Sequence, residues 1–157
     1  MIRIMAVLFL LLPGPATALS CVFPDLATTY KELAAAPQSY VIVYGRYGAN
    51  PARLSQSRDA DILRYKFSGN LIGPNGIGAA FNQPVVVTRS KPRPQFADPG
   101  GSIATDRAVL LFLEKSGGKY LMEASICGFR QFYDPSNQDL RKVSRCMKGL
   151  RCKPSRN

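Results

Sequence analysis

The chain has 157 residues, of which 46% are apolar and 20% charged, and a formal net charge of +11 from 21 Lys and Arg against 10 Asp and Glu. This length suits one domain, and the composition excludes a disordered chain, a collagen and a membrane bundle. The sequence contains no His, which excludes a Ser-His-Asp or Cys-His nucleophile and a zinc or haem site built on imidazole.

The first twenty residues are predicted to be a signal peptide. Arg3 precedes an uninterrupted apolar run over residues 4–12, and a helix of that length rises only ~14 Å, too short for the ~30 Å core of a bilayer. Small residues follow, and the small-x-small rule allows cleavage before Leu19 or before Cys21. We therefore expect an exported protein, periplasmic or extracellular, without a transmembrane segment.

Four cysteines remain after either cut: Cys21, Cys127, Cys146 and Cys152. In an oxidising compartment an even number of cysteines predicts two disulfides, with three connectivities open. There is no C-x-x-C and no His, so we expect neither a metal site nor a cofactor. A lipid anchor on Cys21 is an alternative, although Ala18 stands where such sites usually have leucine.

A helix is expected near the start of the mature chain. Asp25 is placed to cap a helix over residues 26–36, and Pro37 ends it. Its apolar residues from Leu26 to Leu33 share one face, so the helix should pack on another element.

Five strands are then expected, at residues 40–47, 62–67, 85–88, 108–113 and 119–126. The first and fourth are apolar on both faces, as strands buried between two layers should be. The second alternates, with Tyr65 and Phe67 on the face opposite Arg64 and Lys66.

Turns and one loop separate these strands. Residues 73–78 form a glycine-rich turn, whose spacing matches neither a P-loop nor the dinucleotide-binding glycine motif. Residues 116–118 form a tight turn that makes a hairpin of the last two strands. The basic, proline-punctuated residues 89–102 are expected to be an exposed loop.

A last helix should begin near Asp134 and Pro135, because proline suits the first helical turn. Apolar positions between Leu140 and Leu150 recur at helical spacing, and Gly149 is a plausible stop. A helix, five strands and a helix predict a small antiparallel β-barrel with flanking helices, because closure removes exposed strand edges.

The order of elements from Tyr120 to Cys152 is distinctive. A final strand ends in Cys127 and Gly128, an aromatic-rich connection follows, and a Cys-bearing helix comes last. With a cysteine near the start of the mature chain, this order resembles the netrin-type domains, which include the N-terminal domain of the tissue inhibitors of metalloproteinases and short bacterial secreted proteins. The resemblance implies an OB-type barrel.

The predicted fold class is therefore mainly β: a five-stranded antiparallel OB-type barrel with an N-terminal and a C-terminal flanking helix. The barrel domain is predicted over residues 21–150, and a basic tail over residues 151–157 follows it.

The resemblance also implies a pairing of Cys21 with Cys127 and of Cys146 with Cys152. Metalloproteinase inhibitors of this family open with Cys-x-Cys and chelate the zinc of the target through the amine and carbonyl of the first cysteine. Here Val22 follows Cys21 and the next residue is not a cysteine, so the disulfide formed by the second cysteine of that motif is missing. Inhibition of a metalloprotease through an N-terminal Cys21 is one predicted function, and it requires cleavage directly before that residue.

The main prediction is a secreted, disulfide-stabilised, non-enzymatic binding module whose partner is unidentified, with another protein as one candidate. Without His, acid–base catalysis would fall to carboxylates or Lys. The acidic pairs close in sequence are Asp59 with Asp61 and Asp134 with Asp139, and solvated-loop and helix-cap roles account for them. We therefore predict no enzymatic activity.

OB barrels often bind nucleic acid across their second and third strands. The cations that would lie there are Arg64, Lys66, Arg89, Lys91 and Arg93. A single-strand platform needs aromatic rings and cations on the same exposed face. Because Tyr65 and Phe67 alternate with the cations, we expect both rings in the core and do not expect nucleic acid as the partner.

The positive charge is concentrated at the C-terminal end. Residues 141–157 hold seven Lys and Arg and no acidic residue, whereas residues 21–140 hold 13 Lys and Arg against 10 Asp and Glu. A solvated helix face is one interpretation, and binding of a polyanion or an anionic membrane surface is the other. The candidate contact residues are Arg141, Lys142, Arg145, Lys148, Arg151, Lys153 and Arg156.

Overall fold

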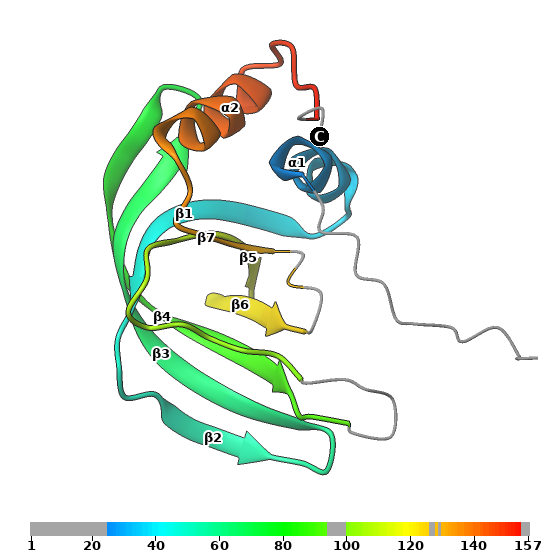
Figure 1. Ribbon diagram of the computed structural model, residues 1–157, viewed down its shortest axis with the longest axis vertical. Helices are drawn as coiled ribbons and strands as arrows, with labels where there is room; N and C mark the ends of the chain where they lie inside the picture. Colours follow the sequence, from blue (N-terminus) through cyan, green and yellow to red (C-terminus); the bar gives the residue numbers. More distant parts are fainter. Residues whose placement is uncertain (1–24, 94–99, 126–127, 129, 155–157) are drawn as a thin grey trace, which may run out of the picture.

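The computed structural model describes residues 25–93, 100–125, 128 and 130–154. The predicted signal peptide with its cleavage sites, Cys21, Cys127 and Arg156 lie outside the described residues. The elements are α1 (Leu26–Ala35), β1 (Ser39–Tyr47), β2 (Ala52–Gln56), β3 (Ala60–Gly73), β4 (Gly76–Ser90), β5 (Val109–Ser116), β6 (Lys119–Ala124), β7 (Gln131–Tyr133) and α2 (Asn137–Met147) (Figure 1).

Five strands close into a barrel in the order β1-β3-β4-β6-β5, and β5 pairs back with β1. The predicted mainly β barrel with a helix at each end is confirmed. Four of the five strand pairings in this ring are antiparallel, and the fifth, between β4 and β6, is parallel. A closed ring with an odd number of strands cannot alternate direction throughout, so one parallel contact is unavoidable.

Two short strands lie outside this ring: β2 pairs with β3, and β7 pairs with the start of β5. The sequence does not predict them, because every residue of β2 is exposed and β7 has only three residues. The hairpin strands β3 and β4 are also longer than predicted, at 14 and 15 residues. Their extra length includes Gly and Asn positions, which carry little strand signal.

The barrel encloses one apolar core, and a second core lies between the barrel and the helices. Val43 of β1 and Leu111 of β5 belong to the inner core, and their neighbours Ile42 and Leu110 belong to the outer one. These two strands are therefore buried on both faces, as predicted. The rings of Tyr65 and Phe67 also lie in the barrel core, and Arg64 and Lys66 are exposed.

Helix α1 starts at the predicted cap, where the Asp25 carboxylate accepts a hydrogen bond from the Ala27 N–H at 2.8 Å. The two helices lie side by side over one end of the barrel (Figure 1). No helix in the described part of the chain is long and apolar enough to cross a membrane.

Helix α2 begins later than predicted. Ser136 and Asp139 form a reciprocal capping box, so Pro135 precedes the cap and does not occupy the first turn. The helix ends as predicted at Gly149, which has a φ of +70°. The N–H groups of Gly149 and Leu150 donate to carbonyls of the last turn, which satisfies acceptors that the helix end would leave unpaired.

Candidate anion-binding site

A disulfide turns the chain back after α2. It joins Cys146 to Cys152 across six positions and is the pair that the netrin resemblance implies; the other implied pair, Cys21 with Cys127, lies outside the described residues. Residues 151–154, which include Cys152, have no regular secondary structure. They run close to α1, where the Cys152 Sγ lies 3.9 Å from the Ala27 carbonyl oxygen.

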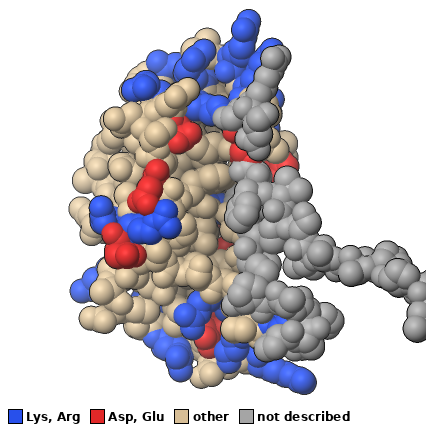
Figure 2. All heavy atoms as spheres, in the orientation of Figure 1, with Lys and Arg blue, Asp and Glu red and all other residues tan. Residues whose placement is uncertain are grey.

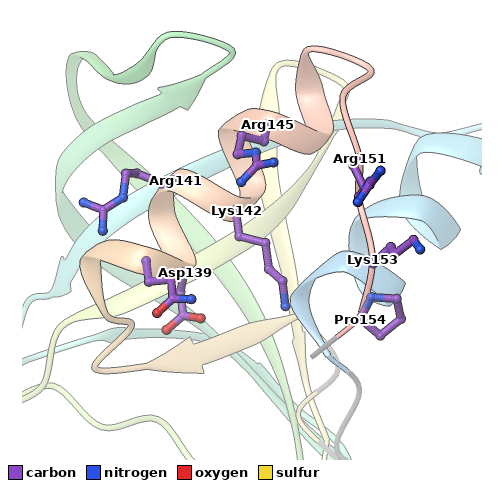
Figure 3. A pocket seen from close by; sticks show the side chains of 8 residues that line it. Asp139, Arg141, Lys142, Arg145, Arg151, Lys153 and Pro154 are labelled. Atoms are coloured by element: carbon purple, nitrogen blue, oxygen red, sulfur yellow. The ribbon is translucent and has the colours of Figure 1, made fainter. Parts of the chain in front are cut away.

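This return leaves a cavity of about 510 Å³ between α2 and residues 151–154. Five cationic side chains line it: Arg141, Lys142, Arg145, Arg151 and Lys153. Figure 3 shows Arg145 on α2, with Arg151 and Lys153 on the segment across the opening. We refer to this space and its five cations as the cationic cavity.

Two groups of the cationic cavity already have structural partners. Lys142 Nζ lies 2.8 Å from the Asp25 carboxylate, and this ion pair joins α2 to the cap of α1. Asp139 accepts hydrogen bonds from the Ser136 hydroxyl and N–H at 2.7 and 2.9 Å. By contrast, no carboxylate among the described residues forms an ion pair with Arg141, Arg145, Arg151 or Lys153.

Lys and Arg side chains also gather at the opposite end of the molecule, near β2 (Figure 2). There, however, Arg89 and Lys91 lie 2.8 and 3.6 Å from the carboxylate of Asp61, and Arg93 lies 3.3 Å from that of Asp59. The hydrogen bond from Arg89 is the main cause that lowers the pKa of Asp61 below its usual value. These three cations therefore compensate acidic groups of the protein itself.

The structure corrects part of the prediction for the acidic pairs. Asp61 belongs to β3 and is only 4% exposed, so the solvated-loop role is wrong for this residue. Asp139 has the predicted cap role, and Asp134 pairs with Arg107 at 2.6 Å. Asp61 is thus neutralised by cations, and Asp139 is engaged by the N-terminus of its helix.

The other predicted basic residues are divided between two places. Arg64 and Lys66 line a separate cavity of about 590 Å³ on the β3–β4 face, away from the cationic cavity. Lys148 does not line the cationic cavity, but it lines a groove of about 420 Å³ between α2 and the β3–β4 turn. We refer to this second space as the hairpin groove.

Sequence reasoning missed the hairpin groove. Its apolar residues Ile77 and Leu150 are 57% and 53% exposed. Helical spacing predicts Leu150 on the buried face of the last helix. The chain leaves the helix at Gly149, however, so the Leu150 side chain does not reach that face. Arg141 and Arg145 line both the hairpin groove and the cationic cavity, so the two form one continuous surface.

Within the described residues, no group of three or more His, Cys, Asp or Glu side chains is placed to hold a metal ion. Comparison of the chain with protein-family models, with curated proteins and with solved structures gives no match, so the resemblance to netrin-type domains stays a prediction.

Proposed function

We propose that this protein is a secreted, non-enzymatic binding module that binds anionic groups of its partner in the cationic cavity. The observation that carries the proposal is the convergence of Arg145, Arg151 and Lys153 on one cavity, without a carboxylate partner among the described residues. The partner class is a polyanion that carries several phosphate, sulfate or carboxylate groups.

Electrostatic repulsion supports this interpretation. Cations that line one cavity repel one another wherever their charges approach within the ~8 Å screening length of physiological salt. The Cys146–Cys152 disulfide holds residues 151–154 beside α2 despite this repulsion. An anion bound between the two sides would convert the repulsion into attraction, whereas solvated cations on a flexible tail would simply separate.

The side-chain types suit oxyanions. An arginine guanidinium presents parallel N–H donors that match two oxygens of a phosphate, sulfate or carboxylate, and a lysine adds a mobile point charge. The cationic cavity combines three arginines with two lysines. Its volume of about 510 Å³ admits more than one such group, which favours a polyanion over a single small ion.

Affinity for a heparin oligosaccharide, measured by calorimetry at several salt concentrations, tests the proposal. We expect salt-sensitive binding to the wild-type protein, because each ion contact formed releases counterions. The triple variant Arg145→Glu, Arg151→Glu and Lys153→Glu should bind at least about ten-fold more weakly, a loss of about 1.4 kcal/mol.

The matched control reverses the same number of charges on the barrel face that OB folds commonly use. Its substitutions are Arg53→Glu, Arg64→Glu and Lys66→Glu. We expect this variant to retain the wild-type affinity for heparin, with circular dichroism verifying that both triple variants are folded. A loss of affinity in the control, with unchanged affinity in the cavity variant, would move the site to the β3–β4 face and contradict the proposal.

A further inference from the structure

The hairpin groove carries an inference that rests on the proposed function and names the partner more closely. Three large apolar side chains are exposed among the described residues: Leu54, Ile77 and Leu150. Leu54 belongs to β2, whereas Ile77 and Leu150 meet at the hairpin groove although 72 residues separate them in the sequence. Two of the three exposed apolar side chains therefore lie together at the end of the molecule that carries the cationic cavity.

The local structure explains why these two side chains stay exposed. Ile77 follows the tight turn between β3 and β4, at the tip of the hairpin. Leu150 takes the position after the glycine stop of α2, where an apolar residue commonly packs back on the last turn of its helix. Here the residues at those positions of the helix are Ser144 and Arg145, and Leu150 stays 53% exposed.

Cations surround this apolar pair. Arg141, Arg145 and Lys148 line the hairpin groove together with Ile77 and Leu150. Arg141 and Arg145 also line the cationic cavity, which adds Arg151 and Lys153 on the far side of α2. One end of the molecule thus combines two exposed apolar side chains with five cations that have no carboxylate partner in the described part of the chain.

We propose that this end docks on the surface of an anionic phospholipid bilayer, with Ile77 and Leu150 inserted at the boundary between the headgroups and the acyl chains. A bilayer interface offers partners both to the exposed apolar side chains and to the cations of this surface. Acyl chains and glycerol accept the apolar side chains, and the lipid phosphates pair with the arginines and lysines. A soluble polysaccharide or nucleic acid would pair with the cations but would leave the exposed isoleucine and leucine in water.

The chain offers a direct probe because it contains no tryptophan. Single variants Ile77→Trp and Leu150→Trp report on the docking end, and Leu54→Trp is the control at the other end. Each is mixed with vesicles of phosphatidylcholine alone and with vesicles that also contain phosphatidylglycerol. We expect the emission of the first two variants to shift to shorter wavelength on the anionic vesicles alone, and that of Leu54→Trp to stay unchanged.

Serine variants of the exposed apolar residues measure how much these side chains contribute to the affinity for vesicles. Ile77→Ser combined with Leu150→Ser should lower partitioning to anionic vesicles at least about ten-fold, while the affinity for heparin stays at the wild-type level. The control Leu54→Ser should change neither value. Reversal of Arg145, Arg151 and Lys153 should lower both, because vesicle and heparin share the cations.

The possible failures are distinguishable. If the wild-type protein binds heparin but not anionic vesicles, or if the double serine variant keeps full vesicle binding, the bilayer inference is wrong and the proposed function stands. A soluble polyanion or an acidic protein would then be the partner. If the wild-type protein binds neither heparin nor vesicles, the proposed function itself is contradicted. An emission shift of Leu54→Trp equal to the other two would place the docking surface elsewhere.

Discussion

At the scale of single residues, the barrel core contains a hydroxyl group without a partner. Tyr47 is 3% exposed, its ring packs against Tyr65 and Phe67, and its hydroxyl makes no hydrogen bond within the described structure. Burial raises the pKa of Tyr47, so the group stays neutral at all ordinary pH values. Burial of the hydroxyl therefore costs desolvation free energy that no hydrogen bond offsets.

Removing this hydroxyl should not destabilise the protein. We expect Tyr47→Phe to leave the free energy of unfolding unchanged or to raise it by up to about 1 kcal/mol. The control is Tyr133→Phe, because the Tyr133 hydroxyl donates to Gln131 at 3.1 Å and accepts from the Ala104 N–H at 3.0 Å. That variant should lose about 1–2 kcal/mol in denaturant unfolding. Equal losses in both variants would show that Tyr47 is hydrogen-bonded in solution.

The close approach of β1 and β3 depends on two glycines that face each other, Gly45 and Gly69. A Cβ on Gly45 would lie 2.7 Å from the Gly69 Cα and would collide with the Ser68 carbonyl oxygen, and a Cβ on Gly69 would collide with the Tyr44 carbonyl oxygen. Glycine inside a strand often marks such a place, where a barrel bends and two backbones nearly touch.

We therefore predict that Gly69→Ala destabilises the protein by at least about 1–3 kcal/mol, because β1 and β3 must separate. Gly73→Ala, in the same strand, should change stability by less than about 0.5 kcal/mol, since a Cβ there meets no atom within 4 Å. Thermal unfolding of the two variants measures the difference. Similar melting curves would mean that the barrel tolerates a wider separation of β1 and β3.

At the scale of elements, the Cys146–Cys152 disulfide connects stability with the site. The bridge spans six positions, so the chain-entropy model gives it about 2 kcal/mol of stabilisation. It also holds Arg151 and Lys153 opposite α2, which is the geometry that the proposed anion site requires.

Replacement of both cysteines by alanine should therefore have two effects. We expect the free energy of unfolding to fall by about 2 kcal/mol, and the affinity for heparin to fall as far as it does in Arg151→Ala combined with Lys153→Ala. Adding those two substitutions to the variant that lacks Cys146 and Cys152 should cause little further loss. Full heparin affinity in the folded variant without Cys146 and Cys152 would show that residues 151–154 bind the anion without the disulfide.

The elements that the sequence predicts are those with a strong local pattern. The start of α1 is marked by Asp25 before an amphipathic run, and the end of α2 by Gly149 after one. The segments at β1 and β5 are apolar on both faces, which indicates strands that are covered on both sides. The exposed strand β2 carries no such pattern, because none of its residues is buried where it pairs with β3. Pro135 and the capping box at Ser136 are equally good start signals, so the local pattern does not choose between them.

At the scale of the whole molecule, the charge distribution separates two basic regions that look alike in the sequence. The cations of residues 89–93 are paired with Asp59 and Asp61, which precede them by about thirty positions. Those of the C-terminal segment have one ion pair, between Lys142 and Asp25, in the part of the chain that is described. The composition of residues 141–157 predicts the cationic surface, but only the three-dimensional arrangement shows which cations remain available.

For the same reason, the proposed docking end could be predicted from the sequence only in part. The basic residues are contiguous in sequence, so a charge count finds them. Ile77 joins them only because a long hairpin carries its tip to the side of α2, a contact between elements about 60 residues apart (Figure 1). No local pattern contains that information.

The central claim is that anions bind between α2 and residues 151–154. The most direct test is a nuclear magnetic resonance titration of the isotopically labelled, disulfide-intact protein with a heparin oligosaccharide, which reports the position of the ligand and not only its affinity. An anion site at this place predicts that the largest amide shifts fall on residues 138–153, with small shifts in β3 and β4 around Arg64 and Lys66. Shifts confined to β3 and β4, or none that saturate, would contradict it.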